Sequence, residues 1–298
     1  MTTVDFNGMV GPPRRLTEIL IQQARNIQML PDVAVQAIRI ADDPDAKVKD
    51  LVRVIAQHVK LTTNLVTLSN STLFGVTQSV AGLEQAITRV GFRQTKNMIM
   101  AASITAMMAE MDWHELRVRD LLCKHSFLTG VICSRLNTLF KLGLQGEEFT
   151  AGLVHDIGRT LLAVSIPEEF DALDPLDFAE ESQISRELDS IGTTHAEVGA
   201  WFLQRNHVPE ELVTVARYHH NPEESDKFKK LVALTALADD MANFCQGGGV
   251  TDDYEFENNT NLQLLETLGA ESPAEKLEEF SGIILSSSLS EMRQLTSF

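Results

Sequence analysis

The sequence predicts an all-α protein made of two helical lobes that meet near residue 115. Apolar residues recur three and four positions apart along most of the chain, as at Val48, Leu51, Val52 and Ile55, which is the spacing of one helix face. The sequence shows neither an extended alternation of apolar and polar residues, the pattern of a half-buried strand, nor an internal repeat. The 298 residues, 44% of them hydrophobic, are enough for one large or two ordinary domains with their own cores.

Proline, glycine and methionine mark the elements of the first lobe. Residues 1–15 are predicted to be a loose leader, and residues 16–114 an N-terminal helical lobe. Pro31 suits the first turn of a helix, where its missing N–H costs nothing, and Gly91 suits the end of one. The next helix, residues 95–111, is rich in methionine, which fits either a packed core or an adaptable surface for a partner protein.

A capping box marks the boundary between the two lobes. Asp112 and Glu115 have the spacing in which a side-chain oxygen caps the first turn and a glutamate reaches back, so we expect a helix from here to about residue 140. Residues 115–246 then form the second helical lobe. Three glycines end that lobe, and residues 247–298 are predicted to be an acidic, partly helical C-terminal tail.

Two helices and the segment between them make up the middle of the second lobe. Residues 149–164 are expected to form one buried helix, because apolar residues recur through them at helical spacing. Thr194 and Glu197 form a second capping box, which places His195 at the first helical position. The intervening residues 166–189 are rich in Asp and Glu and are interpreted as a solvated lid or flap.

The charge of the chain argues against nucleic acid as a partner. The formal net charge is −17 at pH 7 and the isoelectric point is about 4.8, so the phosphate backbone of a nucleic acid would be repelled. The densest basic cluster is Lys227, Lys229 and Lys230, which is too small to reverse that field. We interpret it as a solvated helix face.

A cytoplasmic location is expected. The first ten residues lack the basic start and apolar run of a signal peptide, and no apolar stretch approaches the roughly 20 residues that span a bilayer, so we expect no membrane association. The cysteines are odd in number and form no CxxC motif, which suits a reducing compartment. They are Cys123, Cys133 and Cys245.

A His-Asp dipeptide, His155-Asp156, lies inside an otherwise apolar run. Burying an imidazole beside a carboxylate is costly unless both are paired, and a metal ion is a good partner for both; a hydrogen-bonded core pair is the alternative. Further potential ligands lie on predicted helices of the same lobe. They are His125, His195, His219, His220 and Asp239.

The order His, His-Asp, His, His-His, Asp resembles the HD superfamily of metal-dependent phosphohydrolases, and in particular its two-metal branch, which includes the HD-GYP proteins. Over about residues 16–245 the chain more closely resembles the HDOD family. The motifs that carry this resemblance are Leu30-Pro31, Asp43-Pro44-Asp45, Leu68-Ser69-Asn70-Ser71, Phe74-Gly75, Gln85-Ala86-Ile87, Arg89-Val90-Gly91, Ala151 to Gly158, His195, Glu197 to Ala200, and His219-His220-Asn221-Pro222.

The resemblance implies an HD-like helical bundle and a metal site. One or two divalent transition metals would be held, with Asp156 as the bridge; iron, manganese, zinc and nickel suit an imidazole-rich shell better than calcium does. The implied ligands are His125, His155, Asp156, His195, His219, His220 and Asp239. Catalytic roles are implied for Asp156 and for Arg159, which stands where HD-GYP proteins have a lysine.

Two departures separate the chain from the HD-GYP pattern. Leu121 occupies the position of a glutamate that three-metal members use, and Asn221-Pro222-Glu223 runs on where the GYP segment would follow. Both argue against hydrolysis of cyclic di-GMP.

Two functions stay open at this point. The HDOD resemblance implies a bacterial cytoplasmic signal-transduction module that acts by binding signalling proteins. The complete ligand set implies a metal-dependent phosphohydrolase, a phosphodiesterase or phosphatase acting on a nucleotide or another phosphoester.

Overall fold

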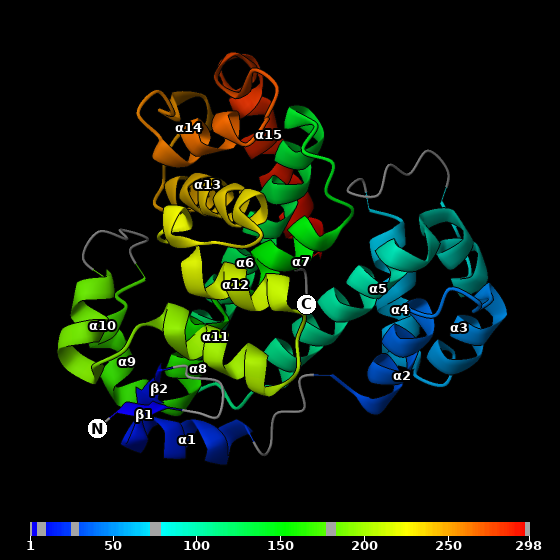
Figure 1. The fold of residues 1–298 in the computed structure, drawn as a ribbon, viewed down its shortest axis with the longest axis horizontal. Coiled ribbons are helices and arrows are strands. Elements are labelled where there is room, and N and C mark those ends of the chain that lie inside the picture. The colour runs from blue at the N-terminus through cyan, green and yellow to red at the C-terminus, as the bar shows by residue number, and fades with distance from the viewer. Residues whose placement is uncertain (1, 5–9, 25–29, 72–78, 177–182, 296–298) are drawn as a thin grey trace.

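The computed structural model of the protein is built almost entirely from helices, which confirms the predicted all-α fold class (Figure 1). The structure describes residues 2–4, 10–24, 30–71, 79–176 and 183–295. The Phe74-Gly75 motif and residues 177–182 of the predicted lid lie outside these ranges.

The N-terminal lobe lies on the right of Figure 1 and consists of α2 (Asp32–Ala41), α3 (Val48–Ile55), α4 (Val59–Ser69) and the first part of α5 (Leu83–Glu110). Gly91 ends the first of the two helical stretches that make up α5, as predicted. It sits inside α5 at φ 79° and ψ 171°, in a conformation that glycine adopts readily, and it kinks the helix there. The methionines of α5 are buried in the core. Of the two interpretations of this methionine-rich helix, the packed core is confirmed, and these side chains do not form a surface for a partner protein.

The second lobe is arranged around α6 (Leu116–Phe140), against which α7 (Glu147–Val154), α13 (Lys229–Gln246) and α15 (Pro273–Leu295) pack. The approach of α7 to α6 is close, because a Cβ at Gly152 would lie 2.5 Å from the Cα of Gly130. The predicted capping box at Asp112 is wrong. The cap position is Glu115, which has no side-chain capping bond, since the chain from Asp112 to His114 does not enter the helix.

Shorter elements surround this frame. They are β1 (Thr2–Val4), β2 (Val10–Pro13), α1 (Arg14–Ala24), α8 (Ile157–Ser165), α9 (Pro167–Leu173), α10 (Gln183–Ile191), α11 (His195–Arg205), α12 (Glu210–Tyr218), the 3₁₀ turns η3 (Pro222–Glu224) and η4 (Thr251–Asp253), and α14 (Thr260–Thr267).

The N-terminal segment differs from the predicted loose leader. β1 and β2 pair antiparallel, with Val4 opposite Val10, and β2 contacts α11. α1, which the sequence assigned to the first lobe, packs against α8 of the second lobe and buries Leu16 and Leu20. An apolar face predicts that a helix is buried, but it does not predict which neighbouring helix covers that face. The sequence therefore could not assign α1 to the second lobe.

The C-terminal region is partly helical, as predicted, and it covers the second lobe. α15 packs along α6, and its residues Leu277 and Leu285 are fully buried in the core. Arg135 of α6 pairs with Glu291 of α15 at 2.8 Å. Among the described residues, no helix has the length and apolarity needed to cross a membrane.

Candidate metal centre

Five separate elements bring the predicted ligands to one place in the second lobe. His125 comes from the middle of α6, and Asp239 from the middle of α13. His195 is the first residue of α11, as predicted, where the side chain of Thr194 accepts a hydrogen bond from the backbone N–H of Glu197. The remaining ligands are His155, Asp156, His219 and His220, which lie where helices end.

The predicted continuous helix over residues 149–164 is wrong at its most important point. His155 is the C-cap of α7 and Asp156, at φ −100° and ψ 17°, is the residue before α8. Apolar spacing runs through the break because both helices are buried, so periodicity does not reveal it. The break lets the His155 and Asp156 side chains project into the same space instead of about 100° apart around one helix.

A close helix contact sets the position of Asp156. A Cβ at Gly158 would lie 1.9 Å from the carbonyl oxygen of His195, so only glycine allows α8 and α11 to approach this closely. The contact brings the start of α8 to the start of α11. Asp156 Oδ1 consequently lies 3.2 Å from His195 Nε2.

The two oxygens of Asp156 face two different pairs of histidines. Oδ1 lies 3.2 Å from His195 Nε2 and 3.4 Å from His219 Nε2. Oδ2 lies 3.4 Å from His125 Nε2 and 3.6 Å from His155 Nε2. A carboxylate placed between two imidazole pairs is the arrangement of a bridging ligand.

Three overlapping groups of ligand atoms result, and within each group all atoms lie within 4.8 Å of one another. The first group joins Asp156 to His195, His219 and His220, and the second joins it to His125 and His155. Asp239 belongs to the third group, and its Oδ1 lies 2.9 Å from His125 Nε2 and 3.2 Å from His155 Nε2. The structure therefore brings together all seven residues that the sequence singled out.

The outer nitrogens of four histidines are held by hydrogen-bond acceptors. His155 Nδ1 lies 2.8 Å from the Gly152 carbonyl oxygen, and His219 Nδ1 lies 3.0 Å from that of Ala216. His195 Nδ1 lies 2.9 Å from Glu187 Oε1. His125 Nδ1 likewise lies 2.7 Å from the side-chain oxygen of Gln246. A carbonyl or carboxylate can only accept, so each Nδ1 carries a proton, and in the neutral ring each Nε2 has its lone pair directed inward.

This tautomer pattern tests whether the residues fit a metal. His125 Nε2 and His155 Nε2 lie 3.3 Å apart, so two neutral rings in this tautomer repel unless a proton or a metal ion lies between them. His219 Nε2 is buried and has no hydrogen-bond partner among the described residues. Imidazole lone pairs directed at shared carboxylates, with the other ring nitrogen donating outward, are the usual arrangement around a bound metal. The residues fit a transition-metal centre.

The electrostatics of the site favour an ionised Asp156, and they shift the surrounding rings in different directions. Burial alone would raise the pKa of Asp156, but His155 and Arg159 hold it well below the usual range of an aspartate. Burial lowers the pKa of His219, and it lowers that of His220 further. A deprotonated carboxylate and neutral imidazoles are the forms that bind metal.

His155 and His195 differ from these two rings because nearby carboxylates outweigh burial. Asp156 and Asp239 raise the pKa of His155. Glu187 is the second carboxylate beside His195. Burial lowers the pKa of His195, but Glu187 and Asp156 outweigh this and raise the pKa to about 10. Glu187 accepts hydrogen bonds from both Nδ1 and the backbone N–H of His195. It thereby fixes the ring, as carboxylates behind metal-bound histidines commonly do.

Arg159 contacts Asp156 rather than open space. Its Nη1 donates to Asp156 Oδ2 at 2.8 Å, while Nε and Nη2 form a fork to Asp174 at 2.7 and 3.1 Å. The arginine is only 4% exposed. The catalytic role expected for Arg159 stays a prediction; its contacts are those of a group that positions Asp156.

Sequence reasoning missed three residues that support the ligands: Asp174, Glu187 and Gln246. Asp174 and Glu187 belong to the acidic segment that was interpreted as a solvated lid, yet they are 3% and 1% exposed. Their partners are 8 to 15 positions away on other helices, so no local spacing reveals them. Gln246 follows Asp239 by seven residues, which places both on one face of α13, and this spacing could have pointed to it.

The centre is closed to solvent on most sides. Six of the seven residues are at most 5% exposed, and His220 alone among them is partly exposed. A catalytic metal site normally keeps one position open to water and substrate, whereas a structural site is enclosed by protein ligands. In the described part of the chain, His220 marks the side nearest to solvent.

Comparison with known proteins agrees with this architecture. A family model for the HDOD domain matches residues 27–222. A crystal structure of an HDOD domain protein with unknown function from Geobacter sulfurreducens superposes with a TM-score of 0.76 at 21% identity, covering 95% of this chain and 99% of the other. A protein of Shewanella amazonensis SB2B named "Putative phosphohydrolase" superposes with a TM-score of 0.69 at 21% identity, covering 93% and 98%.

A curated relative matches at the level of sequence. An uncharacterized protein of Treponema pallidum is 27% identical over 237 residues, which cover 78% of this chain. The match covers 45% of that protein, so the chain spans less than half of the curated relative's length.

Proposed function

This chain belongs to the HDOD domain family, and from that premise we propose that it is a bacterial cytoplasmic signal-transduction module that acts through protein partners and carries a transition-metal centre. We choose this function over the hydrolase because the seven residues of the metal centre are almost completely enclosed by protein. A module that presents its surface to other proteins has no need of an open metal position, whereas a hydrolase must admit its phosphoester. The free cysteines of the described chain suit the proposed reducing compartment.

The metal centre would join parts of the lobe that are distant in sequence. His125, Asp156 and Asp239 would be tied together from α6, the α7–α8 break and α13. Metal that binds only the folded chain stabilises it by mass action. The shape that a partner recognises would then depend on metal occupancy.

The second candidate is a metal-dependent phosphohydrolase, and the two-sided contact of Asp156 favours it. Two divalent ions bound side by side activate water and offset the charge that develops on a phosphoryl oxygen. The protein's own residues would position the ligands: Arg159 holds Asp156, and Glu187 holds His195. A phosphoester would have to enter past His220, the partly exposed member of the set.

One experiment separates the two functions. Protein purified without chelator is analysed for metal and then assayed with manganese against a panel of phosphomonoesters and phosphodiesters, in parallel with Asp156→Ala. The proposed module contains metal and turns over none of the substrates. Turnover that is present in the wild type and lost in Asp156→Ala would overturn the proposal in favour of the hydrolase.

A further inference from the structure

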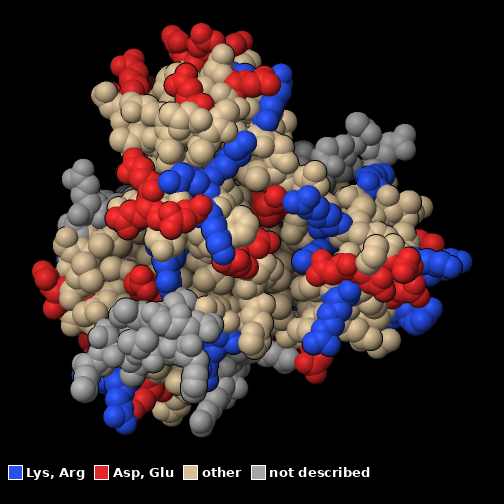
Figure 2. Space-filling view, in the orientation of Figure 1, with Lys and Arg blue, Asp and Glu red and all other residues tan. Residues whose placement is uncertain are grey.

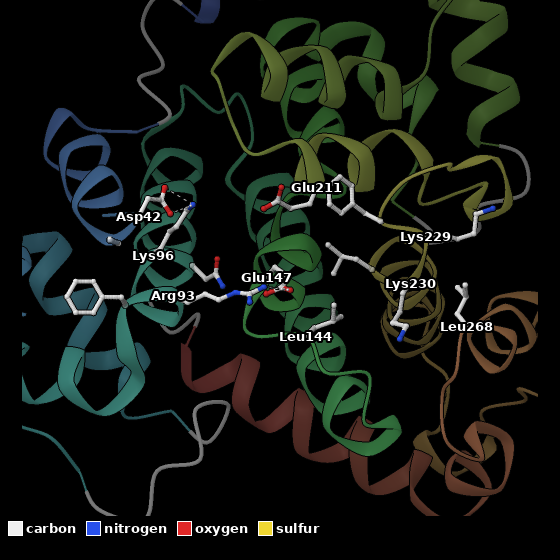
Figure 3. A pocket seen from close by; sticks show the side chains of 14 residues that line it. Asp42, Arg93, Lys96, Leu144, Glu147, Glu211, Lys229, Lys230 and Leu268 are labelled. Carbon is white, nitrogen blue, oxygen red and sulfur yellow. Dashed lines mark hydrogen bonds and ion pairs between the residues drawn. The ribbon is translucent and has the colours of Figure 1, made fainter. Parts of the chain in front are cut away.

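A cleft of about 790 Å³ lies between the two lobes (Figure 3). One wall is formed by the end of α2 and by α5, and the other by the starts of α7, α12 and α13 together with Leu268. Its size is that of a small-molecule site. None of the seven metal-centre residues lines it.

Four basic side chains line the cleft of this strongly acidic protein: Arg93, Lys96, Lys229 and Lys230. Three carboxylates also line it, so the sum is +1 where the whole chain carries −17. Figure 2 shows basic and acidic side chains interspersed across the middle of its face, where the two lobes meet. The interpretation of the lysine cluster as a solvated face fits Lys227, which is exposed, but not Lys229 and Lys230, which are half-buried.

The two walls differ in how their charges are paired. On α5, Lys96 binds Asp42 at 2.7 Å and Arg93 binds Glu147 at 3.2 Å (Figure 3). Both are ion pairs between partly exposed groups, which are weak and can be exchanged for a ligand. Across the cleft, Lys230 makes no hydrogen bond or ion pair with any described residue. The positive charge of the Lys230 amino group is therefore not paired with a carboxylate, and it can bind an anionic ligand.

The N-terminus of α13 also favours the binding of an anion at this wall. A helix N-terminus favours negative charge, yet the first turn of α13 contains no acidic residue and begins with Lys229 and Lys230. The N-cap, Phe228, makes no side-chain capping bond. It also adopts a left-handed backbone conformation, φ 53°, which is costly for a residue with a side chain. Lys229 donates to the Glu223 carbonyl oxygen at 2.9 Å, so Lys230 is the lysine beside this uncapped helix end that is available to a phosphate.

Groups that suit the rest of a nucleotide line the same cleft. Glu211 has no partner among the described residues, and a carboxylate there can accept hydrogen bonds from ribose hydroxyls. Phe228 is 41% exposed and offers a ring on which a base can stack. A purely inorganic anion would use neither group.

We propose that the interlobe cleft binds a nucleotide, with its phosphates on Lys96 and Lys230 and its nucleoside against Phe228 and Glu211. The ligand touches both lobes, and it contacts α13, the helix that also carries Asp239 of the metal centre. The site goes beyond the proposed function, because it needs neither the metal nor a protein partner.

The test is a calorimetric titration of the full chain with ATP and GTP, with adenosine and inorganic tripolyphosphate as partial ligands. We expect saturable binding of ATP or GTP below about 1 mM, and about tenfold weaker binding in Lys230→Gln and in Lys96→Gln. Lys227→Gln is the matched control. It removes the same charge three residues from Lys230, but Lys227 pairs with Glu210 outside the cleft, so its affinity should stay within about twofold of wild type.

Several results would overturn the proposal. They are no saturable binding of either nucleotide, equal weakening in Lys227→Gln, and tripolyphosphate binding as tightly as the nucleotides with no effect of Phe228→Ala. Metal content is measured on every variant. Unchanged metal with lost nucleotide binding locates the effect in the cleft, so failure here is distinguishable from failure of the proposed metal centre.

Discussion

Replacing Glu187 by glutamine should weaken metal binding without touching a metal ligand. Glu187 accepts hydrogen bonds from the backbone N–H of His195 at 2.8 Å and from its Nδ1 at 2.9 Å. A glutamine keeps one acceptor oxygen but turns an NH₂ group toward one of these two donors. One hydrogen bond is therefore lost, and the His195 ring loses both its fixed orientation and the neighbouring charge that makes it a strong ligand.

The expected magnitude follows from the role of this contact. Removing a hydrogen-bond partner behind a metal-bound histidine typically weakens metal affinity about 10- to 100-fold, which corresponds to about 1.4 to 2.7 kcal/mol. Glu187 is 1% exposed, so water cannot take its place without opening the site. We therefore expect the effect in the upper part of that range.

The assay is competition for zinc or manganese between the protein and a fluorescent chelator of known affinity. Glu197→Gln is the control, because it removes the same charge from α11, the helix that begins with His195. Glu197 forms a longer, half-exposed ion pair with Arg217. Equal affinities for wild type and Glu187→Gln, or equal losses in both variants, would refute the argument that Glu187 supports a ligand.

Three further predictions follow from single side chains. Gly158→Ala should lower the free energy of unfolding by about 1 to 3 kcal/mol in urea denaturation, because the added Cβ would lie 1.9 Å from the His195 carbonyl oxygen; Gly82→Ala, with no atom within 4 Å, should change it by less than about 1 kcal/mol. Asp156→Ala should lower the melting temperature and abolish its dependence on chelator, as differential scanning fluorimetry with and without chelator would show. Burial raises the pKa of Glu148 above its usual 4.5. The contribution of this carboxyl to the free energy of unfolding is therefore fully present below pH 4.5, and it is lost as the pH rises through the pKa of the folded state. Glu148→Gln should therefore gain stability relative to wild type as the pH increases from about 4 in a series of denaturation curves, and a constant difference would contradict this.

The sequence predicted the fold class and the seven clustered His and Asp residues because those signals are local or ordered. Helical spacing alone indicates an all-helical chain, and the series of His and Asp residues keeps its order whatever the loops do. The structure places all seven of these residues together, although metal binding itself stays a proposal.

The sequence could not reveal where the central helix breaks. The apolar pattern is the same on either side of His155 and Asp156, since α7 and α8 are both buried. The break depends instead on the contact of Gly158 with α11, whose residues lie some forty positions later in the chain. Only the folded arrangement supplies that information.

The supporting residues were hidden for a related reason. Asp174 and Glu187 are buried, but other acidic residues of the same segment are exposed. The amino-acid composition of the segment does not distinguish the buried carboxylates from the exposed ones. Their partners, Arg159 and His195, are identified by tertiary position rather than by spacing. Acidic composition predicts solvation on average and fails where a buried cation or imidazole needs a carboxylate.

The metal content of the purified protein tests the central claim most directly. Protein prepared without chelator should contain at least one equivalent of iron, manganese, zinc or nickel per chain by elemental analysis, and Asp156→Ala prepared in parallel should contain almost none. A wild-type protein without stoichiometric metal, whose melting temperature is also indifferent to chelator, would contradict the account and leave a histidine cluster held by protons and hydrogen bonds alone.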